Sequence, residues 1–347
     1  MFLHIDIDAF FPSAERLRNK NLVNKPVVVC MFTRKGKSGA VASCSYEARK
    51  LGIKSGMPLH IAKRLATEDT VFLQADKVYY SNLSERVMTE LSYFGNVEIA
   101  SIDEAYINLG DVDDGYALNI ASNIKKHIKT AIGLDVTIGI GKTRILAKMA
   151  SKIAKPNGLK FVGSINDLAD FDITMIPGVG KNTADYLKNN GINNIKNLID
   201  LGPIKIKEMF PNKYGDYISA IILDNEPSIM RKKFKNEEQK QKGRITTLEQ
   251  NTINKDDILN IINRLANELI NELENDILIS NITIMLIDKN MKTMTKSKKI
   301  NPTRNIEIIN GYINEMLGDI KIENEIRRAG IFFSDFIKAK QKTITEW

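Results

Sequence analysis

The side chains best suited to chemistry in this chain are carboxylates, and they occur in two short segments. Asp6 and Asp8 alternate with apolar residues in FLHIDID, the pattern of a strand with one buried face. Asp103 and Glu104 are adjacent in the polar turn of ASIDEAY. Neighbouring carboxylates repel unless a cation neutralises them, and oxygen ligands favour a hard ion such as Mg²⁺. If the two segments lie side by side in one sheet, we expect Asp6, Asp103 and Glu104 to form a two-metal site for phosphoryl transfer.

The composition indicates a folded protein with basic segments. The chain has 347 residues, of which 43% are hydrophobic and 27% are charged, and this size predicts two to three domains. The net charge is +8, and the positive charge is concentrated in segments 231–244 and 289–304. Such segments favour contact with a polyanion such as nucleic acid, although each alone could be a solvated face.

The chain lacks the features of a secreted or membrane protein. Its two cysteines, Cys30 and Cys44, cannot build a disulfide framework, and we expect them in the core. No apolar run reaches the length of a membrane span, so a cytoplasmic protein is expected. His4, His60 and His127 have no spacing typical of a zinc site or a catalytic triad, and we assign them no role.

Apolar periods divide the chain into an N-terminal α/β layer, a helical unit and a C-terminal α+β domain. In the layer we expect a small inserted subdomain at 11–74, helices over 77–95, 116–131 and 143–154, and strands over 26–32, 97–109 and 135–141. The breaker cluster at 155–158 introduces short helices up to about residue 230. The last part predicts helices over 255–275 and 303–317 and strands over 244–250, 277–288, 292–300 and 325–336.

Several motifs follow one another in the order of a known enzyme family. They are DIDAFFPSAE, PVVVC, GAVASCSYEARKLGIKSGMP, ASIDEAY, GIGKTRILAKMASKIAKPNG, IPGVGKNTA and RRAGIFFSDF. With these motifs the chain resembles the Y-family translesion DNA polymerases, specifically the DNA polymerase IV branch and its archaeal relatives. The resemblance implies an α+β right-hand polymerase with a palm (1–10 and 75–164), small fingers (11–74), a helical thumb with a helix-hairpin-helix (165–230), a basic linker (231–243), an α+β little finger (244–337) and a clamp-binding tail (338–347).

The resemblance assigns the catalytic metal site to the carboxylates described above. Asp6, Asp103 and Glu104 match the family's catalytic metal ligands, with the backbone carbonyl of Ile7 as a further ligand to two Mg²⁺ ions. Asp8 matches the motif but is not expected to bind metal directly. Taken singly, each of these acids could be an ordinary exposed turn residue.

Three aromatic or basic residues near the N-terminus match positions that bind the incoming nucleotide. Phe11 matches the steric gate, an aromatic ring that would collide with a 2′-hydroxyl and so selects deoxynucleotides. Tyr46 and Arg49 lie three apart on an expected short helix, so both could reach one triphosphate. The alternative for Arg49 is a surface salt bridge with Glu47 or Glu15.

The other expected nucleotide contacts come from a turn and from the residues before the short helix. Lys155, in the AKPNG turn, matches the family lysine that reaches the β- and γ-phosphates, and Lys152 is a less certain neighbour. Ser43 precedes Tyr46 by three residues and could add a hydroxyl to the same phosphates.

The segment IPGVG at 176–180 precedes a helical apolar pattern and predicts a helix-hairpin-helix. Gly178 and Gly180 would let backbone N–H groups approach a DNA phosphate without reading bases, next to Lys181. The alternative is a plain Pro-Gly turn between two helices.

The C-terminal domain contains further candidate DNA contacts. Arg327 and Arg328 begin an alternating segment that fits a strand laid along the template backbone. The same groove could be lined by Lys296, Lys298, Lys299 and Arg304. Contacts of this kind make DNA affinity sensitive to salt and independent of base sequence.

The end of the chain resembles the peptide that docks on sliding clamps. Gln341, Ile344 and Trp347 have the spacing of its glutamine, aliphatic and aromatic positions, but the usual second aromatic is missing. The alternative is an ordinary tail with one stray tryptophan. The expected partners are primer-template DNA, dNTPs and a sliding clamp, with no membrane partner and with a monomer as the default.

These observations predict a template-directed DNA polymerase that adds dNTPs to a primer 3′ end by two-metal phosphoryl transfer. Gly39, Ala40 and Ala42 in the fingers would leave space over the nascent base pair, which implies low fidelity and synthesis past damaged template bases. Two alternatives remain open: a DNA-binding or clamp-associated scaffold with an inactive palm, and a palm-type nucleotide cyclase.

Overall fold

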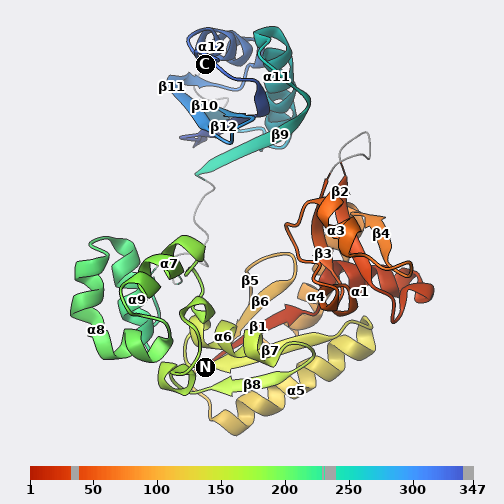
Figure 1. Cartoon of the computed structure of the whole chain (residues 1–347), viewed down its shortest axis with the longest axis vertical. Helices are drawn as coiled ribbons and strands as arrows, with labels where there is room; N and C mark the ends of the chain where they lie inside the picture. The colour runs from red at the N-terminus through yellow and green to blue at the C-terminus, as the bar shows by residue number, and fades with distance from the viewer. Residues whose placement is uncertain (33–38, 229, 231–239, 339–347) are drawn as a thin grey trace, which may run out of the picture. The chain divides into compact units, whose positions relative to one another are not determined.

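The computed structural model describes residues 1–32, 39–228, 230 and 240–338. The chain divides into two compact units, Met1–Asn236 and Glu237–Trp347, and each combines strands with helices (Figure 1). The α+β class expected from the sequence is thereby confirmed. Among the described residues, no helix has both the length and the apolar character needed to cross a membrane.

The first unit is built on a five-stranded sheet with the order β5-β6-β1-β7-β8. Its strands are β1 (Phe2–Ile7), β5 (Val97–Ile99), β6 (Glu104–Asn108), β7 (Val136–Gly141) and β8 (Leu159–Val162). The helices packed on it are α4 (Lys77–Ser92), α5 (Asp114–Ala131) and α6 (Arg144–Ala154). β1 lies at the centre and runs antiparallel to both of its neighbours, so it joins segments that are far apart in the sequence. The helices and strands predicted for this layer are all present.

Side chains alternate between the two faces of this sheet, and the two faces differ in character. Leu3, Ile5 and Ile7 of β1 are buried in a core that they share with α4 and α5. Burial of each such side chain stabilises the fold by about 1.5–3 kcal/mol. His4 and Asp6 therefore point to the opposite face, where α6 packs.

Helix α6 packs directly on β7 because glycines leave room for it. A Cβ atom on Gly139 would lie 2.0 Å from the Ala147 carbonyl oxygen, and a Cβ atom on Gly141 would lie 2.6 Å from the Ala147 nitrogen. Any larger residue at either position would push the helix away from the sheet. Since β7 pairs with β1, the close approach brings the side chains of α6 next to His4 and Asp6.

A smaller sheet with the order β3-β2-β4 forms the inserted subdomain. Its strands are β2 (Val27–Phe32), β3 (Gly39–Cys44) and β4 (Val71–Gln74), and the neighbouring helices are α1 (Phe10–Arg18), η1 (Lys20–Leu22), α2 (Tyr46–Lys50) and α3 (Leu59–Leu65). Cys30 and Cys44 are free thiols buried in its core, which confirms the expectation for them.

Residues 165–222 form short helices, as expected after the breaker cluster at 155–158. They are η2 (Ile165–Leu168), η3 (Ile173–Met175), α7 (Lys181–Asn189), α8 (Ile195–Met209) and α9 (Lys213–Ile222). α8 is interrupted at Gly202, which has a φ of 79°, and Pro203 follows it. These helices share a core with Ile145 and Met149 of α6, so they pack on the same helix that covers the five-stranded sheet.

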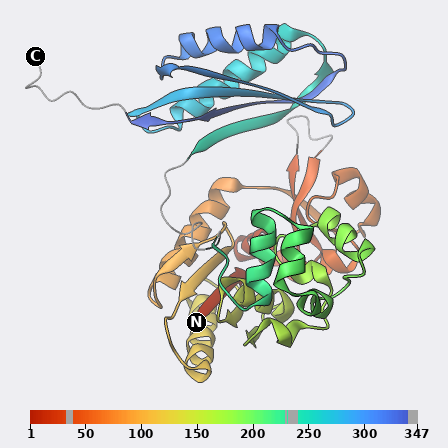
Figure 2. The same cartoon turned by 90° about the vertical axis from the view of Figure 1, so that its left-hand side faces the viewer.

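The second unit is a four-stranded sheet with the order β11-β10-β12-β9, covered on one face by two helices (Figure 2). Its elements are β9 (Gln241–Thr252), α11 (Lys255–Asn271), β10 (Ile277–Asp288), β11 (Thr293–Thr303), α12 (Ile306–Gly318), β12 (Ile326–Ser334) and β13 (Ile337–Lys338). On β10, Ile282 and Ile284 are buried against the helices, whereas Thr283 and Met285 lie on the open face. The helices and strands predicted from residue 244 onwards are confirmed.

The structure corrects the C-terminal limit of the linker expected at 231–243. Residues 231–239 lie outside the described residues, but Gln241, Lys242 and Gly243 form the start of β9 and pair with the end of β12. The polar composition of these residues favoured a linker, whereas backbone hydrogen bonds to a neighbouring strand decide their conformation.

Candidate active site

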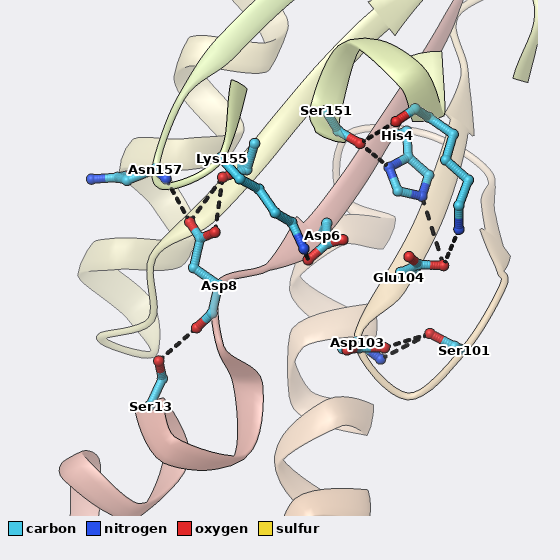
Figure 3. A network of polar contacts seen from close by, with 12 residues as sticks. His4, Asp6, Asp8, Ser13, Ser101, Asp103, Glu104, Ser151, Lys155 and Asn157 are labelled. Atoms are coloured by element: carbon cyan, nitrogen blue, oxygen red, sulfur yellow. Dashed lines mark hydrogen bonds and ion pairs between the residues drawn. The ribbon is translucent and has the colours of Figure 1, made fainter. Parts of the chain in front are cut away.

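Strands β1 and β6 bring the two acidic segments together, as the sequence predicts. Asp6 lies opposite Glu104 in the antiparallel register, and the Ile7 N–H donates to the Asp103 carbonyl oxygen at 2.9 Å. Asp6 and Glu104 therefore share the sheet face that α6 covers, with Asp103 next to them in the turn before β6 (Figure 3). Asp103 also accepts a hydrogen bond from the Ser101 hydroxyl at 2.6 Å.

The Asp6 carboxylate is almost completely buried and faces a lysine. Its side chain is 8% exposed, and its Oδ1 lies 2.6 Å from the Lys155 ammonium (Figure 3). Burial raises the pKa of Asp6 to about 6, with Glu104 and Asp103 acting in the same direction and Lys155 opposing them. The single ammonium group therefore offsets only part of the cost of burying this charge.

The Glu104 carboxylate has two basic neighbours. Its Oε2 lies 2.6 Å from the Lys148 ammonium and 3.9 Å from His4 Nε2. Contact with His4, together with Lys148, lowers the pKa of Glu104 to about 2 against the effect of burial. His4 is fully buried, and its Nδ1 lies 2.7 Å from the Ser151 hydroxyl on α6. Burial lowers the pKa of His4, so Lys148 is the main cation at Glu104.

The Asp8 carboxylate is fully engaged by the protein itself. It accepts hydrogen bonds from the Thr137 hydroxyl at 2.9 Å, from the Tyr46 hydroxyl at 2.8 Å and from the Asn157 N–H at 2.8 Å. The backbone carbonyl oxygen of Asp8 accepts a hydrogen bond from the Ser13 hydroxyl (Figure 3). This carboxylate thus fixes the backbone that connects β1 to α1, and its oxygens already have donors.

The remaining carboxylates fit a site for hard cations. Asp6, Asp103 and Glu104 offer oxygen donors only, and two of them already hold ammonium groups at 2.6 Å, which act as stand-in cations. Within the described part of the chain, no three His, Cys, Asp or Glu side chains are gathered closely enough to form a finished metal site. The donor set suits Mg²⁺, and the two lysines occupy the space in front of Asp6 and Glu104.

A pocket of about 180 Å³ brings most of the predicted nucleotide-binding residues together. Among the residues that line it are Ile7, Phe11, Ser43, Arg49, Asp103 and Lys155. The Phe11 ring stacks on Tyr80 with a centroid distance of 4.2 Å, which fixes its position at the pocket wall.

The two predicted nucleotide-binding residues on α2, Tyr46 and Arg49, contact different groups. The Arg49 guanidinium lies over the Tyr46 ring, 4.7 Å from its centroid, and its Nε donates to the Cys44 carbonyl oxygen. The alternative salt bridges of Arg49 do not form, because Glu47 pairs with Arg16 and Glu15 pairs with Arg18. Arg49 therefore lines the pocket, whereas the Tyr46 hydroxyl is directed to Asp8.

A second pocket of about 350 Å³ lies between the acidic face and the short helices. It is lined by His4, Asp6, Glu104, Lys148, Ser151, Lys152, Lys155 and residues 174–179. Lys152 donates to the Thr174 carbonyl oxygen at 3.1 Å, so this side chain faces the short helices rather than the carboxylates.

The predicted hairpin borders this second pocket. Gly178 has a φ of 87°, a conformation that favours glycine, and Gly180 is the N-cap of α7, which begins at Lys181. A short 3-10 turn, η3, takes the place of a full first helix. The Tyr217 hydroxyl donates to the Pro177 carbonyl oxygen at 2.6 Å, so α9 holds the turn in place.

In the second unit, the predicted basic contacts lie in different surroundings. Lys296 pairs with Asp319 at 2.6 Å and Lys298 pairs with Glu315 at 2.5 Å, so both lysines are directed toward α12 and its C-terminal end. Arg304 donates to carbonyl oxygens at the end of α11. Lys299 has the opposite orientation because side chains alternate along β11.

The structure describes the two predicted arginines of β12 but not the predicted clamp-binding residues. Arg327 is exposed, and Arg328 is half-buried opposite Ile287, on the sheet face away from the helices. The predicted clamp-binding residues Gln341, Ile344 and Trp347 lie outside the described residues.

Sequence reasoning missed the residues that surround the carboxylates. Lys148, Ser151 and Thr137 received no role, and His4 was set aside although it contacts the Glu104 side chain. One signal was present: Lys148 and Lys152 are one helical turn apart and precede Lys155, a spacing that places basic residues on one face of α6 and at its end, and two of them, Lys148 and Lys155, contact the carboxylates.

Family comparisons agree with this geometry. The impB/mucB/samB family matches residues 5–152, and the impB/mucB/samB family C-terminal domain matches residues 239–345. The chain is 33% identical to DNA polymerase IV 1 of Methanosarcina mazei, over 99% of this chain and 98% of that protein. It is 34% identical to DNA polymerase IV of Saccharolobus solfataricus, over 97% of each.

Solved structures point to the same family. A Y-family DNA polymerase chimera is similar with a TM-score of 0.87 and 28% identity, over 97% of this chain and 99% of that one. The insertion ternary complex of Dbh DNA polymerase is similar with a TM-score of 0.66 and 28% identity, over 98% and 99%. The chain therefore belongs to the impB/mucB/samB family, in the DNA polymerase IV branch of the Y-family translesion polymerases, and it is a DNA-directed DNA polymerase.

Proposed function

We propose that Asp6, Asp103 and Glu104, with the backbone carbonyl of Ile7, hold the two Mg²⁺ ions used in DNA synthesis by this enzyme. The observation that carries the proposal is the pairing of β1 with β6, because it gathers the carboxylates at one place on the sheet. When bound, the ions lower the pKa of the primer 3′-hydroxyl and neutralise charge on the triphosphate of the incoming nucleotide.

The chain's own residues act by positioning the reactants. Asp8 holds the connection between β1 and α1 through Thr137, Tyr46 and Asn157, and this connection carries Phe11 to the nucleotide pocket. We assign to Phe11 the exclusion of a 2′-hydroxyl, since its ring is stacked rigidly on Tyr80. Placement of this kind supplies most of the catalysis expected in phosphoryl transfer.

The triphosphate is assigned to the basic side of the same pocket. Arg49, Lys155 and the Ser43 hydroxyl line it and carry donors that suit phosphate oxygens. Tyr46 acts on the nucleotide indirectly in this proposal, through Asp8 and through the stacked Arg49 guanidinium.

The primer-template duplex is assigned to the hairpin turn and to the second unit. At the turn, the backbone N–H groups near Gly178 and Gly180 and the Lys181 side chain suit a phosphate. In the second unit we favour Lys299, Arg327 and Arg328 over Lys296 and Lys298, because the last two already have acidic partners on or next to α12.

These roles correspond to four functional parts. We assign the palm to 1–10 and 75–164, the fingers to 11–74, the thumb to 165–230 and the little finger to the unit that begins with β9. Docking of residues 338–347 on a sliding clamp, a monomeric state and a cytoplasmic location remain predictions from the sequence.

Primer extension tests the proposal directly. Wild type and Asp103→Ala are compared with dNTPs and Mg²⁺ on an intact template and on one with an abasic site. Wild type should extend both primers, and the variant should lose about a thousandfold in rate on both, because a ligand of the proposed Mg²⁺ ions is gone.

A matched control separates this effect from a general loss of acidic charge. Asp114 is exposed in the first turn of α5, so Asp114→Ala should extend both primers at the wild-type rate. Wild-type extension by Asp103→Ala, measured beside this control, would contradict the assignment of Asp103 to the reaction.

A further inference from the structure

A lysine that the family motifs leave without a role lies directly on a proposed metal ligand. The Lys148 ammonium is 2.6 Å from Glu104 Oε2, and their side chains are 33% and 23% exposed. The two residues come from different elements, α6 and the start of β6. Their contact therefore depends on how α6 is docked on the sheet.

Two features fix the docking of α6 at this point. The Ser151 hydroxyl donates to the Lys148 carbonyl oxygen at 2.8 Å and lies 2.7 Å from His4 Nδ1, which links the helix to β1. Gly139 allows the backbone of α6 to touch β7, since a Cβ there would lie 2.0 Å from the Ala147 carbonyl oxygen. The Lys148 side chain consequently starts from a defined place above Glu104.

An ammonium group and a divalent cation compete for the same carboxylate. Mg²⁺ binds carboxylate oxygens at about 2.0–2.1 Å and brings two positive charges, which repel an ammonium held on the same oxygen. We propose that Lys148 is the counter-ion of Glu104 in the metal-free enzyme and that a divalent cation must displace it in order to bind. The inference rests on the proposed function, because it takes Glu104 as a metal ligand.

The surroundings give the displaced side chain a place to go. Lys148 lines the pocket of about 350 Å³ together with residues 174–179, so its flexible stem can swing away from Glu104 without leaving solvent-accessible space. Lys148 then acts as a positioning residue: it holds Glu104 when no metal is present and weakens the first binding of metal.

Metal binding to the free protein tests the inference without using activity. Mn²⁺ is titrated into the full-length chain, without DNA or nucleotide, and free Mn²⁺ is followed by electron paramagnetic resonance. Loss of a partly exposed ion pair that competes with the metal should tighten Mn²⁺ binding about fivefold in Lys148→Met. Lys148→Arg keeps the charge and should stay close to the wild-type affinity.

Lys152→Met is the matched control. Lys152 lies one turn further along α6 and lines the same pocket, but it donates to the Thr174 carbonyl oxygen instead of a carboxylate. This variant removes the same charge and should bind Mn²⁺ as wild type does. Equal tightening in Lys152→Met and Lys148→Met would show a general charge effect and would overturn the inference.

The outcomes also separate this inference from the proposed function. If Glu104→Ala weakens Mn²⁺ binding while Lys148→Met leaves it unchanged or weaker, the metal site stands and the role of Lys148 is wrong. If Glu104→Ala binds Mn²⁺ as wild type does, the ligand assignment itself fails, and the inference fails with it. Circular dichroism of each variant shows that the chain is folded in every titration that is compared.

Discussion

Both units of the molecule contain lysine–carboxylate pairs at nearly the same distance, but the pairs lie in different surroundings. In the first unit, Lys155–Asp6 and Lys148–Glu104 are separated by 2.6 Å, and the carboxylates are only 8% and 23% exposed. In the second unit, Lys296–Asp319 and Lys298–Glu315 are separated by 2.6 and 2.5 Å, and the carboxylates are 58% and 56% exposed.

The comparison of Asp6 with Asp319 shows that the distance to the ammonium group does not by itself set the pKa of the carboxylate. The hydrogen bond from Lys296 lowers the pKa of Asp319, as expected for an exposed acid with a satisfied charge. Asp6 keeps a raised pKa of about 6 although Lys155 is equally close, because burial outweighs the single ammonium group. Asp6 therefore retains a demand for more positive charge, whereas the pKa values of Glu104 and Asp319 are lowered by their basic neighbours.

The largest effect is expected from disrupting the packing of α6 on β7, which positions the buried pairs. Gly139→Ala places a Cβ inside the backbone of α6, so we expect the free energy of unfolding to fall by about 3 kcal/mol. Gly311→Ala in α12 meets no atom within 4 Å and should raise stability by up to about 1 kcal/mol through helix propensity. Urea denaturation followed by circular dichroism measures both; a neutral Gly139→Ala would contradict the close packing.

The next effect concerns the pH dependence of the metal-free protein. The Asp6 pKa is about 6 in the folded chain against 3.8 unfolded, so ionisation of Asp6 costs stability as the pH rises through this window. From pH 4 to pH 7.5 in a chelator, wild type should lose about 2 kcal/mol of unfolding free energy relative to Asp6→Asn. Above pH 5, the difference in unfolding free energy between wild type and Asp319→Asn should stay constant, because the pKa of Asp319 is lowered.

Denaturation curves at a series of pH values provide this measurement. A constant difference between wild type and Asp6→Asn across the window would mean that Asp6 is not destabilised by burial. That result would remove the contrast between Asp6 and Asp319, since this contrast rests on the unequal cost of ionising the two carboxylates.

Removing the lysines sharpens the comparison. Lys155→Met leaves Asp6 buried without its ammonium group and should cost about 1–2 kcal/mol at pH 7.5. Lys298→Met removes an exposed partner of Glu315 and should cost less than about 0.5 kcal/mol. Thermal and urea denaturation of both variants measure the difference, and equal losses would show that exposure does not separate these pairs.

The smallest expected effect is on DNA affinity. Lys299 has the orientation opposite to Lys298 on β11, so Lys299→Ala should reduce the slope of log affinity against log salt by about one. Lys298→Ala is the neighbouring control and should leave the slope unchanged, because Glu315 already neutralises Lys298. Fluorescence anisotropy with a primer-template duplex across a salt series measures both slopes. A change in Lys298→Ala alone would reverse the assignment.

Much of the fold followed from local pattern. The alternation in β1, the apolar helix periods and the breaker cluster after α6 predicted elements that the structure contains. The start of β9 was missed because Gln241 and Lys242 are polar, and only their pairing with β12 makes them a strand. Composition describes how a segment interacts with water, whereas strand pairing depends on a neighbour that is distant in the sequence.

The candidate site shows the same division. The convergence of Asp6, Asp103 and Glu104 could be predicted from the sequence, because the strand pattern and the family motifs single out these carboxylates; their role as metal ligands stays a proposal. The orientation of Lys298 toward α12 could not, since alternation along β11 leaves open which face the helices cover.

Local residue order was thus sufficient to predict the order of the elements and the family, and to single out the carboxylates that we propose as metal ligands. The cations around those carboxylates depended on tertiary structure, because Lys148 and Glu104 are 44 residues apart and meet only where α6 packs against the glycines of β7. Burial, which separates the lysine–carboxylate pairs of the first unit from those of the second, is likewise a property of the packed chain. A lysine and an acid have the same charges in either unit, and the protein around them determines what their contact costs.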